Sequence, residues 1–147
     1  MATKSLSQLK TANRNFDNVL DSYLNLTDGG SVAGKFGLGA QTVAAAGSDQ
    51  AGAGAISATG GGTVIVTGAD DTKGVRLPLL SDCNVGQQFF IMNNLANKTL
   101  EVYPGSGDAV NVLSDNAPVT IAADTIMLCI KMDDAEWFGA ELPVVGA

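Results

Sequence analysis

Alternation between apolar and polar residues dominates the chain from Thr63 onward. Side chains alternate between the two faces of a strand, so this period of two predicts strands and not helices. The candidate strands are 63–67, 75–80, 87–93, 99–103, 109–113, 118–122, 125–131 and 135–142. Clusters of Gly, Asn, Asp and Ser separate them at intervals of about eight to twelve residues, a spacing typical of all-β domains. We therefore predict an antiparallel β-sandwich or jelly-roll-like domain.

The apolar faces of these strands define the predicted core. In the strand 125–131, Ile126, Leu128 and Ile130 share one face, which we assign to the core, and Met127, Cys129 and Lys131 share the other. The full predicted core is Val64, Val66, Leu77, Phe89, Ile91, Leu100, Val102, Val110, Val112, Val119, Ile121, Ile126, Leu128 and Ile130. Trp137 is expected to close one end of it.

Residues 1–28 have a different pattern, with apolar residues at steps of three and four that predict an α-helix. Ser5 or Ser7 suits the start of this helix, and Asp28-Gly29-Gly30 ends it. Its apolar stripe, with one polar position, consists of Leu6, Leu9, Asn13, Phe16, Leu20 and Tyr23. Such a stripe suits a helix that packs on its own domain, and it suits equally a helix that associates with copies or docks on a larger assembly.

Residues 29–62 are rich in Gly, Ala and Ser and offer few side chains that can bury area. This composition is typical of a flexible linker, and also of an extended arm that neighbouring subunits order. The predicted organisation is therefore an N-terminal helical anchor or oligomerisation segment (1–28), a Gly/Ala-rich arm or linker (29–62) and a β-sandwich domain (63–147).

Charge and composition exclude several function classes. The formal net charge of −7 argues against nucleic acid and against anionic membrane surfaces as partners. No stretch reaches the roughly 18 apolar residues that a membrane span needs, and the N-terminus lacks the apolar core of a signal peptide. Synthesis in the cytoplasm with reduced thiols is favoured, although the spacing of Cys83 and Cys129 leaves a disulfide open.

The candidate catalytic and binding motifs are weak. Histidine, the commonest general base and metal ligand, is absent from the sequence, so Cys83 has no histidine to activate it. Asp133, Asp134 and Glu136 offer oxygen ligands for Ca²⁺ without the spacing of a calcium loop. The segment 105–107 (Gly-Ser-Gly) lacks the lysine and helix of a phosphate-binding loop. Cys129 suits a small core residue and Arg76 a surface residue or a contact between subunits. We predict no enzyme activity, no metal and no cofactor.

Several short segments resemble accessory virion proteins of tailed bacteriophages. They are Gly-Val-Arg-Leu-Pro (74–78), Gly86 with an apolar strand ending in Asn93, Leu-Glu-Val-Tyr-Pro (100–104), Gly107-Asp108 with Val110-Asn111, Asn116 and Trp137. The resemblance covers about residues 63–142 and excludes the predicted helix and the Gly/Ala tract.

The resemblance implies a structural protein, a capsid decoration (cement) or head-fibre protein on the virion surface. It further implies a homotrimer with a β-sandwich or barrel body, whose other partner is the major capsid protein or another virion protein. The predicted helix would then supply the docking stripe. The alternative function is a receptor- or carbohydrate-binding module of a phage fibre, which should expose an aromatic cluster beside polar groups.

Overall fold

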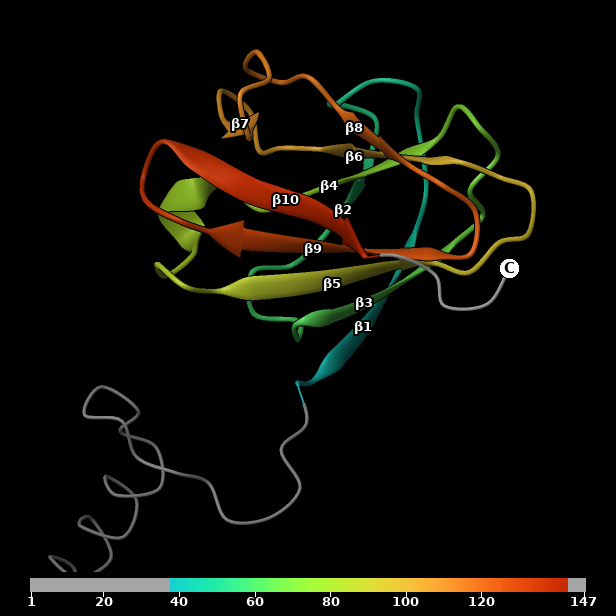
Figure 1. Cartoon of the computed structure of the whole chain (residues 1–147), viewed down its shortest axis with the longest axis horizontal. Helices are drawn as coiled ribbons and strands as arrows, with labels where there is room; N and C mark the ends of the chain where they lie inside the picture. The colour runs from blue at the N-terminus through green and yellow to red at the C-terminus, as the bar shows by residue number, and fades with distance from the viewer. Residues whose placement is uncertain (1–37, 143–147) are drawn as a thin grey trace, which may run out of the picture. The chain divides into compact units, whose positions relative to one another are not determined.

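Ten strands and one 3₁₀ turn make up the part of the chain that the computed structural model describes, residues 38–142 (Figure 1). They are β1 (Ala40–Ala44), β2 (Gly54–Ala55), β3 (Thr63–Thr67), β4 (Gly74–Arg76), the turn η2 (Leu80–Asp82), β5 (Gln88–Asn93), β6 (Leu100–Tyr103), β7 (Ala109–Val110), β8 (Val119–Ile121), β9 (Thr125–Lys131) and β10 (Glu136–Leu142). The chain winds in about four turns, and the fold is a β-solenoid.

Two sheets form the walls of the solenoid. One has six strands in the order β1-β3-β5-β9-β10-β7, and the other has four in the order β2-β4-β6-β8. In the first three turns, successive turns stack in parallel: Ala40 pairs with Thr63, and Thr63 pairs with Phe90. Measured along the six-stranded sheet, the first turn therefore takes 23 residues of chain and the second takes 27.

The last turn runs the opposite way. β8 pairs with β6, and β9 pairs with β5, both antiparallel. β10 then returns along β9 as a hairpin partner, and the two residues of β7 pair with β10 at the edge of the sheet. The reversal ends the parallel stacking of successive turns, and the short β7–β10 ladder at the edge is again parallel.

The prediction of strands is confirmed, but the predicted antiparallel sandwich or jelly roll is wrong. Five of the eight ladders are parallel. The turn signals that suggested hairpins instead lead the chain from one sheet to the other, as Gly68 does between β3 and β4. Within the described range no α-helix is present.

The expectation of a Gly/Ala-rich extended arm is also wrong where the structure describes that tract. β1 and β2 form the first turn of the solenoid, paired with β3 and β4. Small residues serve close packing here, since a Cβ on Gly54 would collide with the carbonyl oxygen of Ala44. The predicted helix over 1–28 lies outside the described residues.

The core lies between the two sheets and is built from side chains that stack across successive turns. In the six-stranded sheet Val64, Ile91 and Met127 occupy neighbouring positions and are almost fully buried. In the four-stranded sheet Val75 and Val102 do the same. Because apolar side chains stack on apolar side chains, each turn buries the apolar face of the previous turn.

Most of the predicted core is confirmed. The buried positions are Val64, Val66, Leu77, Phe89, Ile91, Leu100, Val102, Val110, Ile121 and Trp137. The indole of Trp137 lies against Phe89, with ring centroids 5.8 Å apart. Val119 is only partly buried, and Val112 is wrong, since it is 99% exposed in the loop after β7.

The predicted face of β9 is wrong as well. Met127 and Cys129 point into the core, and Lys131 lies on the same buried side, while Ile126, Leu128 and Ile130 are half-buried on the outer side. The lysine is tolerated inside because its ammonium is fully engaged. Its Nζ donates to the carbonyl oxygens of Leu80 (2.7 Å) and Cys83 (3.0 Å) and pairs with Asp134 (2.7 Å).

Replacing Ile91 by Ala should lower the free energy of unfolding by about 2–5 kcal/mol, because the side chain is fully buried between the sheets. Leu128→Ala should lower it by clearly less, since that side chain is only half-buried. Urea denaturation at low protein concentration measures both. Equal losses would contradict the assignment of faces in β9.

Replacing Lys131 by Met keeps the apolar stem but removes the donor for two backbone carbonyls. We expect a loss of about 1–3 kcal/mol in the free energy of unfolding, the usual cost of a buried acceptor left unpaired. Lys73→Met is the matched control, because Lys73 makes its ion pair with Asp70 at the surface. Thermal or urea melts that show similar losses for both variants would contradict the role of Lys131.

Candidate functional site

The outer side of the six-stranded sheet is the most distinctive surface of the described residues. We call it the outer face and define it by Ile65, Phe90, Met92, Ile126, Leu128, Ile130, Phe138, Ala140 and Leu142. All nine are apolar, and they come from the four strands β3, β5, β9 and β10. None of the nine carries a charge, and the charged Glu136 lies beside them at the edge of the face, on the same side of β10 as Phe138.

The pairing register makes these side chains neighbours. Met92 pairs with Ile65 on one side and with Ile126 on the other, and Ile126 pairs with Leu142. A second row joins Phe90, Leu128 and Ala140, and a third joins Ile130 to Phe138. Side chains that lie opposite each other in adjacent strands are within contact distance. The three rows therefore form one continuous surface.

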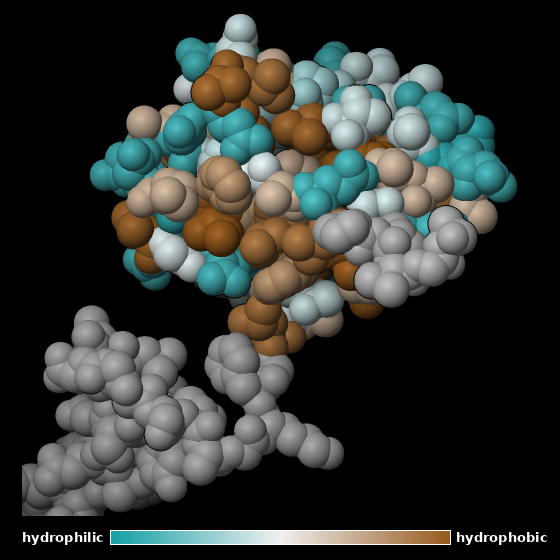
Figure 2. Space-filling model, viewed as in Figure 1, coloured by the Kyte–Doolittle hydropathy of each residue, from teal (hydrophilic) through white to brown (hydrophobic). Residues whose placement is uncertain are grey.

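This surface is open to solvent in the structure. Phe138 is 47% exposed, and the other eight side chains are half-buried, mainly by one another. Figure 2 shows apolar atoms gathered across the middle of the molecule, over β5, β9 and β10 of Figure 1, with hydrophilic atoms towards its edges. Contiguous apolar patches of this kind mark sites of contact with another molecule.

A pocket of about 450 Å³ lies elsewhere, beside the four-stranded sheet. Its wall comes from residues at or after the ends of β2, β4 and β6 in three successive turns: 55–58, 76–79 with Asp82, and 105–106. The structure thus brings together Arg76 and the Gly105-Ser106 segment, two motifs that the sequence analysis considered separately.

The pocket does not suit a phosphate. Its guanidinium, on Arg76, already donates to the carbonyl oxygen of Gln50 (3.2 Å). Asp82 lines the pocket, and the Asp108 carboxylate lies against Gly105 while accepting from the amide of Leu80 (2.9 Å). Two carboxylates beside one cation disfavour an anion and leave room for a neutral polar ligand.

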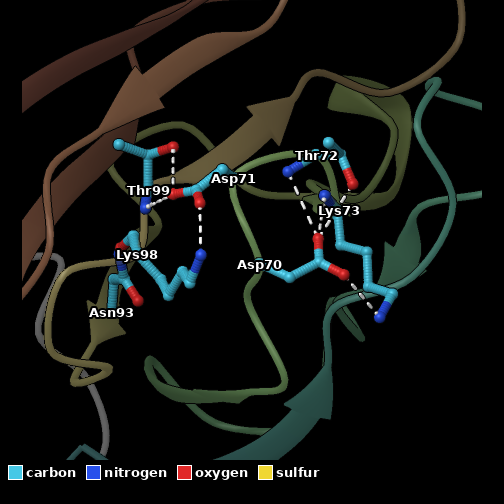
Figure 3. Close-up of polar contacts among 7 residues, drawn as sticks. All are labelled: Asp70, Asp71, Thr72, Lys73, Asn93, Lys98 and Thr99. Carbon is cyan, nitrogen blue, oxygen red and sulfur yellow. Dashed lines mark hydrogen bonds and ion pairs between the residues drawn. The ribbon is translucent and has the colours of Figure 1, made fainter.

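A network of charged side chains joins two turns of the solenoid (Figure 3). Lys98, in the loop after β5, pairs with the Asp71 carboxylate in the loop after β3 at 2.6 Å. The same carboxylate accepts from the amide of Thr99 at 2.9 Å. Asp70 pairs with Lys73 at 2.7 Å and accepts from the hydroxyl of Thr72. Both aspartates therefore hold loop geometry, and each of their carboxylate oxygens accepts at least one hydrogen bond.

These partners shift the pKa values of three charged side chains in the network. The hydrogen bond from Lys98, followed by that from the Thr99 amide, holds the pKa of Asp71 below its usual range. Lys73 and then Thr72 lower the pKa of Asp70 in the same way. Asp71 in turn raises the pKa of Lys98. The two ion pairs of this network, Lys73–Asp70 and Lys98–Asp71, lie at the surface, so salt should weaken them.

The other acidic and sulfur candidates also have structural roles. Asp133 accepts from the amides of Ala135 and Glu136, and Asp134 pairs with Lys131, so neither is arranged for calcium. Cys83 and Cys129 are buried free thiols. Burial raises the pKa of Cys83, and it raises the pKa of Cys129 to about 12, which makes both thiols poor nucleophiles.

Three asparagines from the segments that resemble phage accessory proteins hold loops in place by hydrogen bonds. Asn93 is buried and donates to the carbonyl oxygens of Lys98 (2.7 Å) and Ala122 (2.9 Å). Asn111 bonds the backbone of Gly139 in both directions, donating and accepting at 2.9 Å. Asn116 accepts from the amide of Gly107 (2.7 Å). These residues support the architecture, and the Oδ1 of Asn93 is buried without a hydrogen-bond partner among the described residues.

The predicted docking stripe (Leu6, Leu9, Asn13, Phe16, Leu20 and Tyr23) lies outside the described residues. The outer face, by contrast, was missed. The sequence nevertheless contained a sign of it, because 89–92 (Phe-Phe-Ile-Met) and 126–130 (Ile-Met-Leu-Cys-Ile) are apolar without interruption. A strand of that kind is apolar on both faces, and only one can point into a core.

Comparison with family models, curated proteins and solved structures finds no match. No helix among residues 38–142 is long and apolar enough to cross a bilayer. In the same range, no three acidic, Cys or His side chains gather closely enough to hold a metal ion.

The stability of the fold should depend on pH through Asp71. Its pKa is lowered on folding, so its contribution is complete above the unfolded value of about 4 and is lost as the pH falls through the folded value. We expect the free energy of unfolding to fall below about pH 4, and less steeply in Asp71→Asn. The Asn side chain suits the positive φ of 76° at this position.

Urea denaturation between neutral and acidic pH measures this dependence. Asp115→Asn is the control, since Asp115 is an exposed residue of the loop before β8 and should retain the slope of the parent chain. A slope in Asp71→Asn equal to that of the parent would contradict the prediction.

Proposed function

We propose that the chain is a structural component of a virion, a capsid decoration (cement) or head-fibre protein attached to the surface of a phage particle. The outer face is the observation that supports this best. An uncharged apolar surface from four strands is suited to lasting contact with protein, and its exposure in a free chain is unfavourable.

The roles of the polar groups support a scaffold over an enzyme. The described ion pairs and buried amides hold loops together, and both thiols are buried. The resemblance to phage accessory proteins, over residues 63–142, points to the same class. Under this proposal the chain is a homotrimer, its other partner is the major capsid protein or another virion protein, and it is made in the host cytoplasm.

A second candidate function is a receptor- or carbohydrate-binding module of a phage fibre. The pocket of about 450 Å³ favours it, because Arg76, Asp82 and two serines give donors and acceptors for a neutral polar ligand. The expected aromatic cluster is not found in residues 38–142: Trp137 and Tyr103 are buried, and Phe138 lies on the outer face. The structural function is therefore preferred.

Deleting residues 1–28 should abolish binding to the parent particle and leave a folded β domain, because the described strands of the solenoid all lie within residues 40–142. Particle binding is measured by co-sedimentation and by imaging, and the fold by circular dichroism. The intact chain is the control, and it should be found in purified particles by mass spectrometry.

Two results would count against this proposal. A truncated chain that decorates the particle at full occupancy would show that residues 1–28 are not the anchor. An intact chain that is absent from purified particles would remove the virion function altogether, whatever its behaviour in solution.

A further inference from the structure

We infer that the pocket beside the four-stranded sheet binds a neutral oligosaccharide, which lies across three turns of the solenoid. Ser57, Arg76, Asp82 and Ser106 supply its hydrogen bonds from the pocket wall. This inference rests on the second candidate function and names its ligand class. It does not depend on whether the chain is attached to a virion.

The polar side chains of the pocket come from three stacked turns. Ser57 follows β2, and Ser106 follows β6. Arg76 is the last residue of β4, and Asp82 lies in the 3₁₀ turn of the same solenoid turn. Because β2 pairs with β4 and β4 pairs with β6, these positions stack along the solenoid. Adjacent strands are about 4.8 Å apart, so the hydrogen-bonding groups spread over about 10 Å and suit a chain of sugar units.

The two charged side chains favour a ligand that is uncharged and that both donates and accepts. No ion pair within residues 38–142 involves Arg76 or Asp82. Arg76 donates from Nη1 to the carbonyl oxygen of Gln50 (3.2 Å), and its other N–H groups have no partner in the same range. A guanidinium only donates and an ionised carboxylate only accepts, whereas a hydroxyl does both. Neighbouring hydroxyl groups of a sugar therefore satisfy both side chains.

The rest of the wall is apolar and suits the C–H face of a sugar ring. Ile56 and Leu77 are buried in the wall, and Leu79 is 40% exposed beside them. Ligand sites typically combine such apolar walls with a few polar groups that fix the orientation of the ligand. The volume of about 450 Å³ also lies in the range of small-molecule sites.

An extended peptide suits the pocket less well. Such peptides bind by adding a strand to free main-chain groups. In this wall the amide of Ile56 already donates to the carbonyl oxygen of Arg76, and the amide of Leu77 donates to that of Tyr103, both at 2.9 Å. An anionic glycan is disfavoured as well, because the Asp82 carboxylate lines the pocket.

Binding of the intact chain to an array of immobilised ligands tests the inference. The array contains neutral oligosaccharides of glucose, galactose, mannose and N-acetylglucosamine, together with sialylated glycans, sulfated glycans and short peptides. At least one neutral oligosaccharide should bind in preference to the anionic glycans and the peptides. Calorimetry with that oligosaccharide in solution then measures the dissociation constant.

Two variants of the pocket connect binding to this site. Asp82→Asn removes the anionic acceptor and should raise the dissociation constant at least about ten-fold. Asp82 is exposed, so circular dichroism should stay that of the parent chain. Arg76→Lys keeps the charge but loses the planar fork of donors, and it should also weaken binding. Asp124→Asn is the matched control, because it removes the same charge from an exposed position outside the pocket wall, and it should bind as the parent does.

Several results would overturn the inference. One is binding to no neutral oligosaccharide at millimolar concentration, and another is a preference for the anionic glycans. A dissociation constant unchanged in both Asp82→Asn and Arg76→Lys would place the binding elsewhere. An equal loss in Asp82→Asn and Asp124→Asn would reduce it to an effect of overall charge.

These outcomes separate the inference from the proposed functions. A chain that prefers a peptide would keep the receptor-binding function and overturn the sugar ligand. A chain found in purified particles that binds no sugar would keep the virion function and overturn the inference. Sugar binding that is lost in Asp82→Asn, by a chain found in no particle, would support the site and reject the virion function.

Discussion

Register between successive turns is the constraint on which this structure depends. Each turn must place an inward apolar side chain beside that of the previous turn, as Ile91 does against Val64 and Met127. The parallel ladders supply the backbone hydrogen bonds, and the stacked side chains exclude water from the space between the sheets. The network of Asp71 and Lys98 acts on the same register from outside, because it ties the loops of two consecutive turns.

The sequence predicted the strands and most of the core, but not the way in which the strands are arranged. Period-two alternation is the same for a strand in a hairpin and a strand in a solenoid turn. The deciding contacts pair residues that are 23 and 27 positions apart, and no local turn motif records such a spacing. In β9 the buried face could not be assigned from the strand alone. It depends on a tertiary contact, because the ammonium of Lys131 donates to the carbonyl oxygens of Leu80 and Cys83, in and after η2.

The outer face was harder to predict than the strands. Part of its signature was visible in the uninterrupted apolar run 126–130, but the pattern does not say which side faces water. The pocket was still harder to predict, since its wall comes from three separate turns and no single segment contains all of its polar side chains. Sites that depend on stacking of distant segments can be recognised only once the winding of the chain is known.

The reversal of the chain at β8 and β9 gives the solenoid two unlike ends. At the final end, the edges are the two residues of β7 and the three of β8, too short to template another strand. At the first end, β1 is a five-residue edge strand with one side unpaired among the described residues. Duplication of one turn in the gene would therefore lengthen the solenoid at the β1 end and leave the hairpin of β9 and β10 unchanged. The architecture thus permits solenoids of different length that share the same final hairpin.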